Sequence, residues 1–274
     1  MAPPREPLEQ AESDRISAAI AEKDGDRIVA LFDAGGPAWQ ASATLGCKAA
    51  QGLSDLGRHQ DAIRVLDRLE AQFPAAIRPK QLRALALARR ARPGDLGEAQ
   101  AILGALYDRG ERDPETLGIY GRTWMDRYAA SGDRRDLTRS RDLYAEAFGR
   151  APDDHYTGIN AAAKCVLLGG DENLKQAAEY ADRVQSLLGT EPQPGDYWAT
   201  ATIGEVFLIR RQFADAARLY RAAVEMARAV EGAHRSTWTQ ACRLMARLEP
   251  SGDERALVRA AFAHLPDCAG LGVA

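Results

Sequence analysis

The clearest pattern of apolar, small and polar positions lies in residues 197–230. An apolar stretch surrounds Gly204, a polar turn follows, and a second apolar stretch surrounds Ala216. This pattern predicts two antiparallel helices that cross closely where the two small residues meet. The rings of Phe207 and Tyr220 are expected to fill the space on either side of the crossing.

A second unit of the same kind spans about residues 43–74, with Gly57 in its turn and Ala62 at its crossing. Weaker units centre on three further small residues, Ala99, Ser140 and Ala177. The spacings from Ala62 through these residues to Ala216 are 37, 41, 37 and 39 residues, somewhat longer than the roughly 34 residues of a tetratricopeptide repeat. The sequence therefore resembles a series of tetratricopeptide-like helical hairpins. We expect an all-α solenoid of about twelve to fourteen helices.

Helix-capping residues and terminal hairpins complete this organisation. Helices are expected to begin at four acidic signals, namely Asp95 with Glu98, Asp113 before Pro114, Asp153 or Asp154, and Asp196. A solenoid needs terminal caps because its end repeats would otherwise expose apolar faces. We therefore predict an N-terminal tail and capping hairpin over residues 1–36, repeats over residues 37–232, and C-terminal capping helices with a tail over residues 233–274.

The middle of the chain carries motifs beyond the generic repeat. They are residues 117–122 followed by Trp124, residues 144–148, and the Tyr-Thr-Gly-Ile-Asn element at residues 156–160. Together they resemble the TRAFs-binding domain of MAP kinase kinase kinases, over about residues 113–248. That domain also occurs in stand-alone bacterial proteins, and the resemblance implies a tetratricopeptide-type regulatory region that recruits signalling partners. In the kinases these partners are TRAF adaptors.

The chain lacks a glycine-rich nucleotide loop, a catalytic-loop Asp with its downstream Asn, and an Asp-Phe-Gly motif, so kinase activity is not expected. The composition is rich in alanine and arginine, which is typical of a bacterial protein, and a bacterium offers no TRAF adaptor.

Charge and cysteine spacing narrow the possible partners and the compartment. The formal net charge is −3 and the pI is about 5.9, so we expect binding neither to nucleic acid nor to a membrane surface. The four cysteines are too far apart for a metal or redox motif, and we expect four thiols in a reducing compartment. The sequence starts without an apolar leader and contains no membrane-length apolar run, so a cytoplasmic location is expected.

The sequence shows no signature of catalysis, of a cofactor or of a metal site. His155 is the one histidine with polar neighbours, but an acid–base role needs a nucleophile and an orienting partner that the sequence does not place. We favour a helix start in which Asp153 or Asp154 acts as the cap. The protein is therefore not expected to be an enzyme.

Two further patterns allow both a structural and a binding interpretation. Six basic residues lie in residues 77–94 without an acid among them, and they form either a solvated helix face or a site for phosphate groups. Tyr120, Trp124 and Tyr128 share one helix face, which favours a place in the core over a peptide groove.

The leading hypothesis is a scaffold or adaptor that takes part in signalling. It would hold a protein or peptide segment on the concave face formed by the first helices of successive hairpins. The side chains expected to contact the partner are Arg122, Asp126, Tyr156, Asn160, Lys164 and Glu205. Asn160 serves equally well as a ligand contact or as a lock on a neighbouring hairpin. The alternative hypothesis is a sensor that encloses a small molecule or short peptide and regulates a separately encoded effector.

Overall fold

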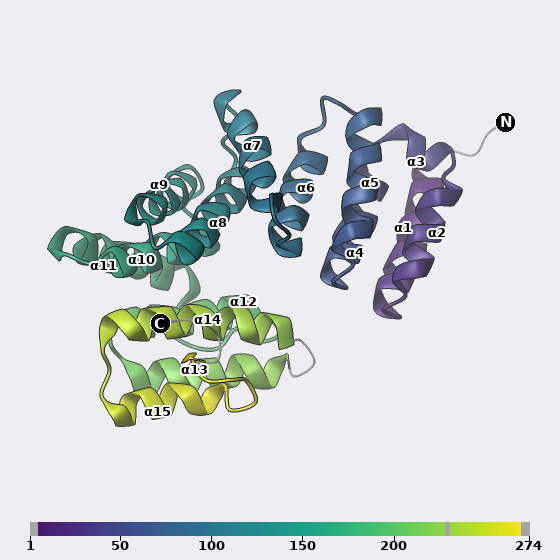
Figure 1. Ribbon diagram of the computed structural model, residues 1–274. Helices are drawn as coiled ribbons and strands as arrows, with labels where there is room; N and C mark the ends of the chain where they lie inside the picture. Colours follow the sequence, from purple (N-terminus) through teal and green to yellow (C-terminus); the bar gives the residue numbers. More distant parts are fainter. Residues whose placement is uncertain (1–4, 228–230, 270–274) are drawn as a thin grey trace. The chain divides into compact units, whose positions relative to one another are not determined.

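The computed structural model describes residues 5–227 and 231–269, which form fifteen α-helices and no β-strand (Figure 1). The predicted all-α class is confirmed. The described helices slightly outnumber the expected twelve to fourteen, and one of them is the five-residue α3 (Pro37–Ala41). The chain divides into two compact units, residues 1–123 and residues 124–274, and the division falls within α8 (Pro114–Ser131).

Residues 1–123 form a row of helices in which neighbours along the chain pack together. The predicted N-terminal hairpin is present and precedes the first repeat. The helices are α1 (Arg5–Ala21), α2 (Gly25–Ala34), α3, α4 (Thr44–Asp55), α5 (His59–Gln72), α6 (Ile77–Arg90), α7 (Asp95–Asp108) and the first part of α8.

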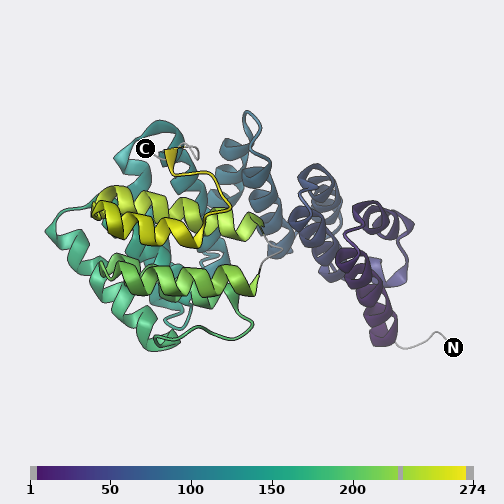
Figure 2. The same cartoon turned by 90° about the horizontal axis from the view of Figure 1, so that it is seen from below.

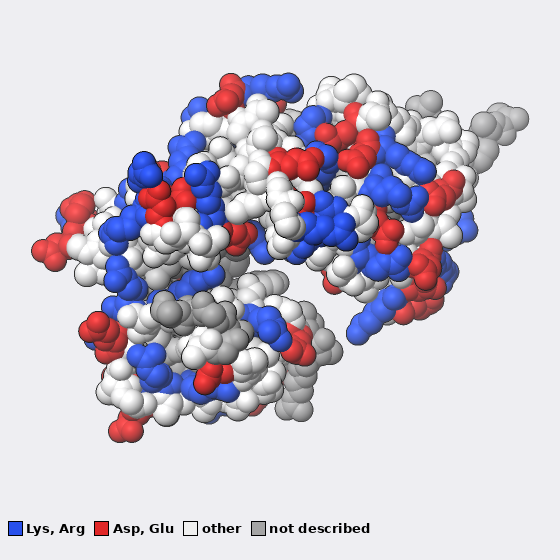
Figure 3. Space-filling model, viewed as in Figure 1, with Lys and Arg blue, Asp and Glu red and all other residues white. Residues whose placement is uncertain are grey.

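The basic residues of α6 and its following turn are bound to neighbouring segments of the same unit. Four arginines form ion pairs, namely Arg78 with Glu115, Arg83 with Asp67, Arg89 with Asp55, and Arg90 with Asp95. Arg92 donates to the Gln60 side chain, and Lys80 donates to the Pro74 carbonyl. Figure 3 shows the basic and acidic side chains interspersed on the visible surface of this unit. The run therefore links α6 to its neighbours, which favours its structural interpretation.

One predicted helix cap in this unit is wrong, although α7 begins at Asp95 as expected. Gly94, and not Asp95, occupies the N-cap of α7, and no side chain caps the helix there. The Asp95 carboxylate instead accepts hydrogen bonds from the Arg90 guanidinium, at 2.6 and 2.8 Å, and from the backbone N–H of Arg92. A charged, bidentate partner is stronger than a single backbone donor, so the ion pair determines the position of this carboxylate.

Residues 124–274 contain the second set of hairpins, and α12 to α15 lie side by side (Figures 1 and 2). After α8 the helices are α9 (Arg134–Arg150), α10 (His155–Leu168), α11 (Asp171–Leu188), α12 (Tyr197–Ile209), α13 (Phe213–Met226), α14 (Glu231–Leu248) and α15 (Gly252–Ala261). The side chains of Asp113, Asp154 and Asp196 accept backbone N–H groups at the starts of α8, α10 and α12, so these predicted caps are confirmed.

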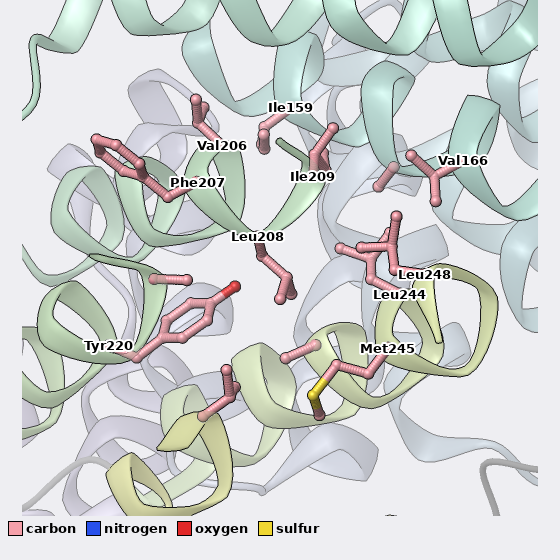
Figure 4. Packing of buried hydrophobic residues seen from close by; sticks show 14 of the residues in the cluster. Ile159, Val166, Val206, Phe207, Leu208, Ile209, Tyr220, Leu244, Met245 and Leu248 are labelled. Carbon is pink, nitrogen blue, oxygen red and sulfur yellow. The ribbon is translucent and has the colours of Figure 1, made fainter. Parts of the chain in front are cut away.

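A large apolar core in residues 124–274 draws side chains from α9 through α15. Figure 4 shows part of it, in which Leu208 of α12, Val166 of α10 and Leu244 of α14 converge. Side chains removed from water in this way supply most of the stability of a helical repeat, because short helices are marginal on their own.

The predicted repeat register is confirmed by burial. The five residues placed at helix crossings are each at most 1% exposed: Ala62, Ala99, Ser140, Ala177 and Ala216. At the best-defined hairpin, a Cβ added to Gly204 would lie 2.9 Å from Cδ1 of Tyr220, so only glycine lets these two helices approach as closely as they do.

The cysteine prediction is wrong for one pair. Cys242 and Cys268 form a disulfide with their Cα atoms 5.5 Å apart, whereas Cys47 and Cys165 are buried thiols. Burial raises the pKa of Cys47 to about 11 and also raises that of Cys165, which leaves both thiols unreactive. The disulfide forms because the chain turns back along α14 after α15, a path that cysteine spacing alone does not reveal.

Candidate functional site

The predicted binding residues of α10 lie one helical turn apart and are joined by side-chain hydrogen bonds. Asn160 Nδ2 donates to the Tyr156 carbonyl at 2.9 Å, and Lys164 Nζ donates to Asn160 Oδ1 at 2.7 Å. The Lys164 ammonium also lies 5.2 Å from the centre of the Tyr144 ring, a cation–π distance. Asn160 therefore links the Tyr156 backbone and the Lys164 side chain of its own helix, and these bonds do not tie it to a neighbouring hairpin.

Lys164 and Glu205 are buried, with 3% and 9% of their surfaces exposed. Glu205 is on α12, and one of its carboxylate oxygens accepts a hydrogen bond from Gln240 Nε2 of α14 at 3.1 Å. Burial raises the pKa of Glu205 to about 7, while the positive charge of Lys164 and the bond from Gln240 oppose the rise. Glu205 and Gln240 thus join α12 to α14, and the charge of Lys164 on α10 acts on Glu205; we call these residues the Lys164–Glu205–Gln240 cluster.

Gln240 and Tyr144 were not predicted from the sequence. Gln240 follows Glu205 by 35 residues, about one repeat length, so repeat periodicity was the signal that could have identified it. Tyr144 lies on the preceding helix, α9, and is 2% exposed. No local spacing links it to Lys164.

Two exposed aromatic residues occupy the same position in successive first helices. Tyr156 is the second residue of α10, after the Asp154 cap, and Trp198 is the second residue of α12, after the Asp196 cap. They are 47% and 53% exposed, among the most exposed large apolar side chains described. From the sequence, Trp198 was expected only as one residue of the repeat at 197–230. The signal for its exposure was the repeated order of Asp cap, one residue, and aromatic residue.

The packing of Tyr156 and Trp198 leaves their outer faces available. The Tyr156 ring stands edge-on to Tyr144, with ring centres 6.1 Å apart, and Trp198 stands edge-on to Tyr197 at 5.1 Å. The hydroxyl of Tyr197 is bonded to Thr237 of α14 at 2.8 Å, which fixes its ring beneath Trp198. Both exposed rings therefore rest on buried aromatic supports, and such supports lower the conformational entropy lost on binding.

The remaining predicted contacts, Arg122 and Asp126, lie in α8 on either side of the division between the two units. Both are half-buried. In the first unit, burial lowers the pKa of His59, and the charges of Arg89 and Arg122 add to this effect. Hydrogen bonds bring three of the six predicted residues together, Tyr156, Asn160 and Lys164, and the charge of Lys164 acts on a fourth, Glu205.

The aromatic stripe of α8 is largely part of the packing, as favoured from the sequence. Tyr120 is 8% exposed and its ring centre lies 6.1 Å from that of Tyr107. Tyr128 packs against a buried cluster that contains Met125 and Leu137. Trp124 is half-buried, and the Arg127 guanidinium lies 5.0 Å from its ring centre.

His155, the histidine considered for an acid–base role, is the first residue of α10. His155 Nδ1 is buried without a hydrogen-bond partner there, and Asp154 caps α10. Within residues 5–227 and 231–269, no cluster of three or more His, Cys, Asp or Glu is arranged to hold a metal ion. In the same residues, no helix has the length and apolar character needed to cross a bilayer.

Comparisons with known proteins agree with this geometry. Residues 48–168 match the family described as Tetratricopeptide Repeats-Sensor. Among curated proteins, none matches the chain.

Two solved structures are similar to the chain in fold. TTC0263, a thermophilic TPR protein of Thermus thermophilus, superposes with a TM-score of 0.56 at 15% identity, over 73% of this chain and 98% of its own. Yeast Tom70 superposes with a TM-score of 0.53 at 14% identity, over 90% of this chain, which spans half of the Tom70 chain. The chain therefore has the fold of tetratricopeptide-repeat proteins.

Proposed function

We propose that the protein is a non-catalytic interaction scaffold that binds a protein or peptide segment along the first helices of its hairpins. The observation that carries this proposal is the pair of exposed aromatic residues, Tyr156 and Trp198, at equivalent positions of α10 and α12. Tetratricopeptide repeats generally mediate protein–protein interactions, and large aromatic residues are the commonest energetic anchors of such interfaces.

The predicted contact residues take different roles in this proposal. Within residues 124–274, Tyr156 and the half-buried Asn160 touch the partner, together with Trp198 and Asp126, whereas Arg122 of the first unit stays a predicted contact. The buried Lys164 and Glu205 do not contact the partner. They act indirectly, because the Lys164–Glu205–Gln240 cluster fixes the first helices that carry the contacts. The resemblance of residues 113–248 to a TRAFs-binding domain supports a signalling partner, and we place this function in the cytoplasm of a bacterium.

Replacing Tyr156 or Trp198 with alanine should weaken partner binding by about tenfold or more, since truncating an aromatic anchor typically costs more than about 1.4 kcal/mol. The partner is first isolated by affinity purification from the native organism and identified. Its affinity for each variant is then measured by calorimetry with purified components.

The matched controls are Leu174→Ala and Leu187→Ala on α11, because these leucines are 46% and 44% exposed but lie on the second helix of the hairpin. Both controls should keep the wild-type affinity. Equal losses for the α11 controls and for the aromatic variants would contradict the assignment of the binding face.

A sensor is the second candidate, and one observation favours it: the family that matches residues 48–168 is described as a sensor class of these repeats. In that case the first helices enclose a small molecule or short peptide and the protein regulates a separate effector. A thermal-shift screen with nucleotides and metabolites distinguishes the candidates, because a small-molecule sensor shows saturable stabilisation by one of them and a pure scaffold shows none.

A further inference from the structure

The segment that follows α15 lies along one face of α14. His264 shares a hydrogen bond with His234, at 3.0 Å between Nε2 and Nδ1, and the Pro266 carbonyl accepts from Trp238 Nε1 at 2.8 Å. Cys268 is bonded to Cys242. The partners on α14 are thus four residues apart and those on the segment two apart. Three successive pairs therefore join the segment to one face of α14. We call residues 264–268 the strap.

The strap and the end of α15 cover buried aromatic rings. Trp238 is 1% exposed and Phe262 is fully buried, and their rings stack with centres 5.1 Å apart. Arg259 donates to the carbonyls of Phe262 and Leu265, and its guanidinium lies 5.5 Å from the centre of the Trp238 ring. Removing the strap would therefore open a path from solvent to Trp238 and to Cys242, which is also 1% exposed.

The two sulfur positions differ in accessibility. Cys242 lies inside α14, whereas Cys268 is partly exposed at the end of the strap. An external thiolate therefore reaches the sulfur of Cys268 first. Besides the disulfide, the strap is held by the hydrogen bonds of His264 and Pro266, by the bond from Arg259 to the Leu265 carbonyl, and by the buried Leu265 side chain.

We propose that the strap is a latch controlled by thiol–disulfide exchange, closed when Cys242 and Cys268 are bonded and open when they are reduced. A thiolate of an external dithiol attacks Sγ of Cys268, the Cys242–Cys268 bond breaks, and Cys242 leaves as a thiolate that takes up a proton. The second thiol of the dithiol then displaces Cys268, which is protonated in turn. The dithiol is oxidised to its disulfide, and the chain gains two electrons and two protons.

The latch residues lie on α14 and beyond α15, and the His234 ring lies 5.5 Å from the ring of Tyr197, the buried support of Trp198. Disulfides found in a reducing compartment are usually transient or redox-sensing, which agrees with a regulatory role. The uncovered surface would be the aromatic face of Trp238 and Phe262.

The test is the labelling rate of Cys242 by a maleimide in the full-length Cys268→Ser variant, read by mass spectrometry of its peptides. The buried thiols Cys47 and Cys165 report global opening within the same molecule. We expect Cys242 to react at least tenfold faster than both. In the oxidised wild type, Cys242 should not react, and dithiothreitol should make it react as in the variant. A Cys47→Ser control keeps the disulfide and should keep Cys242 protected.

Three results would overturn the proposal. Labelling of Cys242 as slow as that of Cys165 would show that the strap stays closed without its bond. Equally fast labelling of all three thiols would show that the disulfide holds the whole fold together. In a third measurement, the wild type is exposed to oxidised glutathione and then denatured without reductant. Four reactive thiols in that protein would show that the Cys242–Cys268 bond does not form.

Discussion

Replacing Gly158 with alanine should lower the free energy of unfolding by about 2 kcal/mol. A Cβ at this position of α10 would lie 2.7 Å from Cγ2 of Val184 and 2.9 Å from two ring atoms of Phe148. Both neighbours are fully buried, on α11 and α9, so neither can move aside without disturbing the core. The gain in helix propensity, about 1 kcal/mol, offsets only part of this cost. Urea denaturation of the two proteins measures the difference.

The matched control is Gly149→Ala in α9. No atom lies within 4 Å of a Cβ added to Gly149, so the substitution should raise stability by up to about 1 kcal/mol through helix propensity alone. The two substitutions are chemically identical and should change the denaturation midpoint in opposite directions. Two midpoints that both rise would mean that α10 does not approach its neighbours as closely as described.

Gly158 also shows which parts of the fold could be predicted from the sequence. It belongs to the Tyr-Thr-Gly-Ile-Asn element at residues 156–160, and like Ala62 and Ala216 it is a small residue at a close helix contact. Small residues at repeat spacing are set by the packing of neighbours along the chain, so a single sequence reveals them. The hairpins and their crossings were predicted for this reason.

The features that the sequence did not reveal depend on helices from different repeats. Gln240 meets Glu205, and Cys268 meets Cys242, only because α14 stacks beside α12 and the chain turns back after α15. Their spacing in the sequence is compatible with many other arrangements. The exposure of Trp198 has the same origin, since burial of a helix face depends on what packs against it.

The free energy of unfolding of the wild type should fall by up to about 3 kcal/mol between pH 4.5 and about 7 because of Glu205, and Glu205→Gln should abolish this fall. In the folded protein burial raises the pKa of Glu205 from 4.5 to about 7, so the folded state holds a proton that the unfolded state has lost. Stability from this group is therefore complete below pH 4.5, falls as the pH rises, and reaches its lower level above about pH 7. The glutamine variant has no titrating group at position 205. The difference between its free energy of unfolding and that of the wild type should therefore change across this pH window.

The difference between variant and wild type is the proper measure because other groups also titrate in this range. His59 and His234 have pKa values lowered by burial, so their contribution to stability rises with pH and partly masks the effect of Glu205. Glu179→Gln on the exposed face of α11 is the matched control and should leave the pH profile unchanged.

Lys164→Met tests the cause of the shift in the same measurement. The charge of Lys164 lowers the pKa of Glu205, so its removal should raise that pKa further and move the loss of stability to higher pH. At pH 8 the variant should also lose about 3 kcal/mol, because the buried carboxylate is left without its cation. Chemical denaturation from pH 4 to pH 9 gives all four profiles. A Lys164→Met profile parallel to that of the wild type would show that the two charges do not interact, and the Lys164–Glu205–Gln240 cluster would then not connect α10 with α12.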